Sequence, residues 1–182
     1  MRDCFDERKS TEIAGLLLKL GGDVMHYMAL IKLMYIIDRE ALKRWGYPLS
    51  GDKYYSLPHG PILSRVYELV LEEPELSESA YWKEFIIRHK DFKIKLRFNT
   101  PDGALSEAEK TLITEVFNEF GHLDRFALRD LTHTFPEWKN PGKSRLPISY
   151  EDILRAVGRE KEADEIAGEI RDFMFTRSLL SS

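Results

Sequence analysis

The side chains that could carry chemistry in this sequence are one cysteine, five histidines and one carboxylate inside an apolar pattern. Cys4, the only cysteine, stands in a charged N-terminal segment where nothing local holds a base beside it. A reactive thiol needs a site that stabilises its thiolate, so we expect no nucleophilic role for Cys4. A single cysteine cannot form an intramolecular disulfide, which is typical of proteins in a reducing compartment.

The five histidines lie on separate segments, at His26, His59, His89, His122 and His133. No two have the i, i+4 spacing that places two zinc ligands on one face of a helix. Asp130 and His133 can touch on one helix, but nothing beside them supplies a nucleophile, so we interpret the pair as a local hydrogen bond. Gly21-Gly22 lacks the spacing and the preceding strand of a phosphate-binding loop. We therefore expect no enzyme, no metal site and no cofactor.

Asp38 is the carboxylate that needs an explanation. It falls inside the apolar stripe of a long predicted helix, between Met34 and Ala41. A carboxylate in such a place is costly unless it is paired or hydrogen-bonded. We expect Asp38 to be buried and to anchor this helix to the segment from Tyr54 to Arg65. A titrating functional group is the alternative.

Around these residues the sequence predicts a mostly α protein (α+β) with one small antiparallel β-hairpin, in a single domain over residues 1–182. The first helix, about 11–20, has Ser10 as its N-cap, and the long second helix, about 24–45, follows Asp23. An extended segment covers 52–57, and Pro61 is predicted to open a third helix that ends in an acidic turn over 72–75. Further helices are expected at about 107–120, 125–134, 150–157 and 160–175, two of them with capping sequences at Ser106 and Ser149.

A hairpin is predicted between Lys83 and Phe98, where the apolar period changes from 3.6 to 2. Its second strand should turn four apolar side chains toward the protein, namely Phe92, Ile94, Leu96 and Phe98. Six Lys or Arg stand against two carboxylates from Lys83 to Arg97. This surplus predicts either a docking surface centred on Lys93, Lys95 and Arg97 or a solvated face that protects a sheet edge.

Two more charged faces are candidates for binding a partner. Steps of seven and four residues place Lys32, Arg39 and Lys43 in one basic stripe on the long helix, which we expect to face solvent. The last helix, about 160–175, has an acidic outer face that includes Glu162 and Glu169. By charge alone this acidic face is as good a candidate as the basic ones.

Composition limits the class of protein. Lys plus Arg number 27 and Asp plus Glu number 31, so the net charge is −4, which argues against a general nucleic-acid coat. No signal-peptide core and no apolar run long enough to span a bilayer is present. The sequence predicts a soluble, cytoplasmic protein without a membrane partner.

Three segments together resemble a known family. They are Lys32-Leu33-Met34-Tyr35-Ile36-Ile37-Asp38-Arg39, Gly46-Tyr47-Pro48-Leu49-Ser50-Gly51-Asp52-Lys53-Tyr54 and His59-Gly60-Pro61. In order and spacing they are similar to the Panacea domain, the SocA-like antitoxin family that is also described as phage-associated and GepA-like. A later part, Trp138 and the run 147–154, fits the same family, so the resemblance covers about residues 10–158.

The resemblance implies an antitoxin that neutralises a toxin encoded beside it by direct binding, and related domains act against unrelated toxins. The SocA branch is associated with delivery of its toxin to a bacterial protease, so an adaptor role is an alternative. We expect the family motif to build the fold, which would give a structural role to Tyr35, Asp38, Tyr54, His59, Gly60, Pro61 and Trp138.

The remaining alternative is a DNA-binding regulator. Three helices followed by a basic hairpin is the order of a winged-helix domain, in which the hairpin would be the wing. The third predicted helix has only Arg65 as a cation, however, and a helix that reads bases usually presents Arg, Lys, Asn or Gln. Many relatives carry an extra DNA-binding domain, for which a chain of 182 residues has no room.

Overall fold

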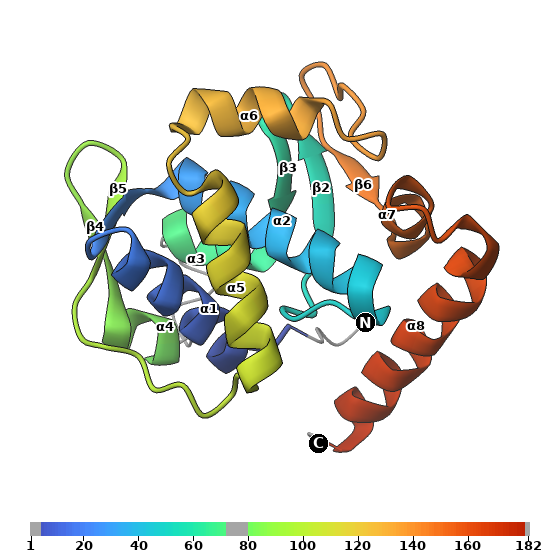
Figure 1. The fold of residues 1–182 in the computed structure, drawn as a ribbon, viewed down its shortest axis with the longest axis horizontal. Helices are drawn as coiled ribbons and strands as arrows, with labels where there is room; N and C mark the ends of the chain where they lie inside the picture. Colours follow the sequence, from blue (N-terminus) through green and yellow to red (C-terminus); the bar gives the residue numbers. More distant parts are fainter. Residues whose placement is uncertain (1–4, 72–79, 181–182) are drawn as a thin grey trace.

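A computed structural model describes residues 5–71 and 80–180 of the chain (Figure 1). Its central element is α2 (Tyr27–Trp45), which is buried on nearly every side from Ala29 to Asp38. The helices α1 (Glu7–Leu20), α5 (Glu107–Phe120) and α6 (Arg125–His133) pack against it. The long apolar pattern in the sequence therefore corresponds to a core helix, as a helix that is apolar all round should.

Two small antiparallel sheets lie beside this helical core. One has the strand order β1 (Val24–His26), β5 (Lys93–Leu96), β4 (Ile86–His89). The other has the order β3 (Gly60–Leu63), β2 (Tyr54–Leu57), β6 (Leu146–Ile148). The remaining elements are α3 (Ser64–Leu71), α4 (Ala80–Phe85), α7 (Tyr150–Ala156), the short 3₁₀ turn η2 (Glu160–Glu162) and α8 (Ala163–Leu180). The α+β class predicted from the sequence is confirmed.

Helix ends that depend on local signals fall where the sequence predicts them. Ser106 and Glu109 form a capping box at the start of α5, and Ser149 and Asp152 form another at the start of α7. Gly46 ends α2 in the left-handed conformation, with φ of 75°. Each signal lies within four residues of the end that it specifies.

The start of the chain differs from the prediction. Helix α1 begins at Glu7, with Asp6 rather than Ser10 as its N-cap, and Ser10 is buried inside the helix. Residues 24–26 form β1 instead of the first turn of α2, because they pair with β5 about 70 positions further along the chain. His26 then caps α2 by accepting a hydrogen bond from the backbone N–H of Met28.

Pro61 lies in β3 and does not open a helix, so that prediction is wrong. Gly60 has φ of 99°, and a Cβ there would lie 2.8 Å from the hydroxyl of Thr132, which reserves the position for glycine. Helix α3 starts only at Ser64, where the buried carboxylate of Asp52 accepts the backbone N–H groups of Arg65 and Val66. The cap therefore comes from a residue twelve positions upstream.

The predicted hairpin is present, but over a shorter range. Lys83 belongs to α4, and the two strands pair from Ile86 to Leu96. Ile94 and Leu96 are buried as expected, whereas Phe92 and Phe98 are 68% and 56% exposed. Phe92 lies in the turn with a positive φ, and Phe98 follows the end of β5. Neither continues the alternation of the strand.

Asp38 is buried, as the sequence predicts, and all its hydrogen bonds are accepted from one neighbouring segment. The carboxylate accepts the backbone N–H of Leu49 at 2.8 Å and of Ser50 at 3.1 Å, and the hydroxyl of Tyr54 at 2.8 Å. The hydroxyl of Ser50 donates a fourth bond. Burial raises the pKa of Asp38, while these four donors oppose the shift. The partners thus span 49–54, and Arg65 binds Asp52 instead.

Two further predictions cannot be compared with the structure, because Cys4 and the acidic turn over 72–75 lie outside the described residues. The last helix is longer than expected: after η2 over 160–162, α8 continues to Leu180.

Asp38→Ala should lower the free energy of unfolding by about 3 kcal/mol, the scale for opening a buried polar network. Tyr54→Phe removes only one donor and should cost about 1 kcal/mol. Urea unfolding followed by circular dichroism measures both values. Equal stability of Asp38→Ala and the parent protein would contradict the anchoring role of this carboxylate.

Candidate partner-binding surfaces

The motif residues of α2 meet the loop after α6 in a second buried polar group. Glu137, which is buried, accepts the Tyr35 hydroxyl at 3.1 Å and the Arg39 guanidinium at 2.7 Å. The guanidinium of Arg39 also lies 4.2 Å from the centre of the Phe135 ring. Arg39 is therefore held in an ion pair and a cation–π contact within the fold.

Lys32 is also part of the interior. Its exposed fraction is 1%, and its ammonium group donates to the backbone carbonyl of Pro61 at 2.6 Å. Burial lowers the pKa of Lys32 to about 7. The expected solvent-facing stripe of Lys32, Arg39 and Lys43 is therefore wrong: of the three, only Lys43 is largely exposed. Periodicity correctly places the three side chains on one side of α2. That side is largely covered, however, by β3 and the loop after α6.

Trp138 closes this region from the outside. Its indole N–H donates to the carbonyl of Leu57 at 3.1 Å, and its ring stacks on His133 at 3.9 Å between ring centres. The predicted contact between Asp130 and His133 is replaced by an ion pair of Asp130 with Arg129. His59 is exposed at the turn between β2 and β3, while the other family-motif residues make contacts inside the fold.

The hairpin presents a basic surface. Lys93 and Lys95 are exposed and alternate with the buried Ile94 and Leu96, so they share the outer face of their sheet. Arg97, two residues further on, is exposed as well. None of these three cations has an ion-pair partner among the described residues. They are free to meet an external anion.

Helix α6 adds to this surface from a distant part of the sequence. Arg125 and Lys93 are the two cations whose charges, after burial, lower the pKa of His26 on the neighbouring strand β1. The guanidinium of Arg125 also lies 4.6 Å from the ring centre of Phe126, which is half exposed. We call Lys93, Lys95, Arg97 and Arg125 the basic face. Arg125 was missed by the sequence reasoning because only tertiary packing brings it near His26 on β1, the strand beside β5.

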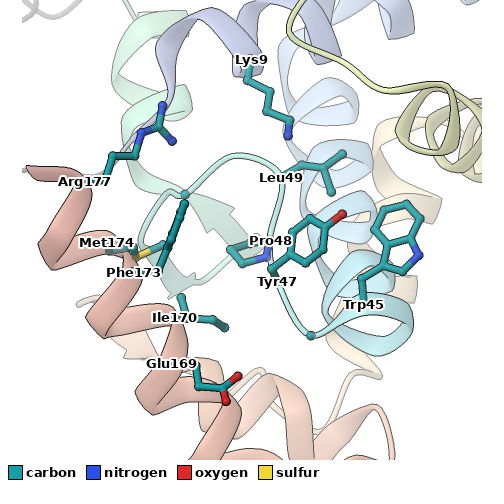
Figure 2. Close-up of a pocket in the computed structure, with 12 residues that line it drawn as sticks. Lys9, Trp45, Tyr47, Pro48, Leu49, Glu169, Ile170, Phe173, Met174 and Arg177 are labelled. Atoms are coloured by element: carbon teal, nitrogen blue, oxygen red, sulfur yellow. The ribbon is translucent and has the colours of Figure 1, made fainter. Parts of the chain in front are cut away.

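A groove lies on the side of the molecule away from the hairpin, between α8 and the segment that follows α2 (Figure 2). Its volume is about 460 Å³, and its walls are mostly apolar. Lys9 and Arg177 stand at one end and Glu169 at the other. The walls between them include Trp45, Tyr47, Pro48, Ile170, Phe173 and Met174.

The sequence matches a known protein family. A family model, described as "Antitoxin SocA-like, Panacea domain", matches residues 30–139, more than half of the chain. The chain belongs to this family. No curated protein and no solved structure matches the chain.

The match to the Panacea domain covers most of α2, the Asp38 network, strands β2 and β3, the hairpin and α6. Helix α8 lies outside the matched residues. In the part of the chain that the structure describes, no helix is long and apolar enough to cross a membrane. No group of three His, Cys, Asp or Glu side chains able to hold a metal ion occurs there either.

Lys32 should make the stability of this Panacea domain depend on pH. An unfolded lysine titrates at about 10.4, whereas the folded pKa is about 7. Between these values the unfolded chain binds the proton and the folded chain does not. Stability should therefore rise with pH in this window, by up to about 1.4 kcal/mol per unit from this residue.

Lys32→Met keeps the length of the side chain without the charge and should flatten that rise. Urea unfolding from about pH 7 to about pH 10 measures the slope. Lys43→Met, at the exposed end of the same helix, is the matched control and should leave the slope unchanged. The same slope in Lys32→Met and the parent protein would show that the buried ammonium is not its source.

Proposed function

We propose that this protein is the antitoxin of a toxin–antitoxin pair and that it neutralises a protein toxin, encoded by a neighbouring gene, by binding it directly. The observation that carries the proposal is the match of residues 30–139 to the SocA-like antitoxin family. The resemblance of the motif segments in order and spacing points in the same direction. Direct binding in the cytoplasm is the simplest way in which a domain of this kind can act on a protein.

The basic face is the surface we propose for the toxin. Lys93, Lys95 and Arg97 are exposed, and the chain as a whole has a net charge of −4, so their charge is local. A local charge of one sign steers a partner of the opposite sign and fixes its orientation. The exposed ring of Phe92 at the tip of the hairpin supplies the apolar contact that charges alone lack. The expected toxin surface is therefore acidic with an apolar centre.

The other charged residues considered from the sequence are less suited to this role. Lys32 is buried and Arg39 is paired with Glu137, which leaves Lys43 as the exposed cation of that helix. Lys43 has a carboxylate neighbour, Glu40, at 4.0 Å. The acidic side of α8 is a candidate only for a basic toxin.

Charge reversal tests the proposed surface. The triple variant Lys93→Glu, Lys95→Glu, Arg97→Glu should weaken binding of the toxin about 10- to 100-fold, because attraction across the interface becomes repulsion. Its circular dichroism and melting temperature should match those of the parent, since the three side chains are exposed. Calorimetry or a pull-down with the product of the neighbouring gene measures the affinity.

The matched control changes three other exposed lysines, Lys139, Lys143 and Lys161, to glutamate and thus makes the same change in net charge. This control variant should bind the toxin with the affinity of the parent protein. Equal loss in both triple variants would indicate an effect of net charge only, and loss in neither would exclude the basic face.

Titration in cells separates neutralisation from the other roles. Neutralisation by binding follows mass action, so rescue of growth should require at least as much of this protein as of the toxin. Rescue at strongly substoichiometric levels would indicate the proteolytic adaptor instead, with a protease as a second partner. Salt-dependent binding to DNA by the protein alone would support the winged-helix regulator.

A further inference from the structure

The groove beside α8 exposes apolar side chains that the described part of the chain, residues 5–71 and 80–180, leaves open to solvent. Phe173 is 68% exposed and lines the groove, and Leu180 is 84% exposed. Leu180 follows Phe173 by seven residues, which places both on the same side of the helix. Tyr47, stacked on Trp45 across the groove, is half exposed too. Exposed apolar side chains that gather on one face of a helix mark a binding surface.

The charges at this surface have an order that limits what can cover it. Glu169, Phe173 and Arg177 are spaced by four residues and follow one another along one side of α8. Arg177, whose side chain is 49% exposed beside Asp6, stands at one end of the groove, and the carboxylate of Glu169 stands at the other end (Figure 2). This side of α8 therefore presents a carboxylate at Glu169, an aromatic ring at Phe173 and a guanidinium group at Arg177.

We infer that a second copy of this chain covers the groove, with the two α8 helices antiparallel about a two-fold axis at Phe173. An interface of this symmetry uses the same patch twice, so the patch must be complementary to itself. A two-fold rotation about the middle of the patch lays its negative end on the positive end of the other copy. Glu169 of each chain then faces Arg177 of the other, and the two Phe173 rings meet at the axis.

The existing ion pairs at the positive end are compatible with this contact. Arg177 lies 2.6 Å from Asp6, and both side chains are partly exposed to solvent. Lys9 is paired at 2.6 Å with Glu109, which is buried, so Lys9 takes no part in the proposed contact. A partly exposed pair such as Arg177–Asp6 contributes little to stability, so a second carboxylate can join it at little cost to the fold. The apolar contact supplies the free energy, and the charges set the antiparallel direction.

The dimer leaves the basic face open. Helix α8 and the β4–β5 hairpin lie at opposite ends of the longest axis of the molecule (Figure 1). A dimer through α8 therefore points its two hairpins away from each other. This inference goes beyond the proposed function and does not rest on it, because the second copy needs no toxin.

Sedimentation velocity on the full chain, from about 1 to about 100 micromolar, tests the inference. The parent protein should reach twice the 21.3-kDa mass of the chain within this range. Phe173→Asp should remain a monomer throughout, because it places two carboxylates at the axis. Phe175→Asp is the matched control: Phe175 is as exposed as Phe173 but points to another side of α8, so this variant should still dimerise.

A charge exchange tests the antiparallel arrangement. Glu169→Arg should weaken the dimer at least about tenfold, and Arg177→Glu in the same chain should restore it, since both cross-pairs are then rebuilt with reversed sign. Melting curves of each variant show that the chain is folded.

A parent protein that stays monomeric over the whole range would overturn the inference. So would a dimer that Phe173→Asp leaves intact, or one that the double exchange does not restore. If the parent protein is monomeric and Phe173→Asp abolishes toxin binding, the groove binds the toxin and not a second copy.

Discussion

The segments of the family motif are held together by the hydrogen bonds of one buried carboxylate, that of Asp38. It lies on the central helix, and its four donors come from Leu49, Ser50 and Tyr54. A buried carboxylate without these donors would be several kcal/mol less stable, so the loop after α2 must return to it in one conformation. That return also fixes Asp52, two residues beyond Ser50, whose carboxylate caps α3. One charge in the core thus sets the path of the chain from 46 to 66.

Much of this fold follows from local patterns in the sequence. The core position of α2, the capping boxes at Ser106 and Ser149, and the turn of the hairpin could be predicted, because each signal and its effect lie within one helical turn or one strand. Strand β1 could not, since its partner is Lys93–Lys95, far along the chain. Strand β3 pairs with its neighbour β2 across a two-residue turn, but the sequence around Pro61 predicts the start of a helix instead. The sequence 24–26 is compatible with a helix, and only pairing with a distant strand makes it extended.

The candidate surfaces show the same limit more strongly. Periodicity placed Lys32, Arg39 and Lys43 on one side of α2, and they do share it, but sequence gives no means to know that β3 and the loop with Glu137 cover two of them. Arg125 joins Lys93 only through the packing of α6 near β1. The exposure of a side chain depends on every element that packs against it, and these elements can lie far away in the sequence. Exposure is therefore difficult to predict from a single sequence.

The residues of the family motif are mostly buried, whereas the residues that we propose to contact the partner are exposed. Tyr35, Asp38 and Gly60 lie in tight internal contacts, where most substitutions would cost stability. Lys93, Lys95 and Arg97 of the basic face are exposed instead, and their replacement should change little but the charge presented to a partner. The resemblance implies that related domains act against unrelated toxins. Under the proposed function, a fixed polar core below an exposed face that tolerates substitution would let one fold meet different toxins.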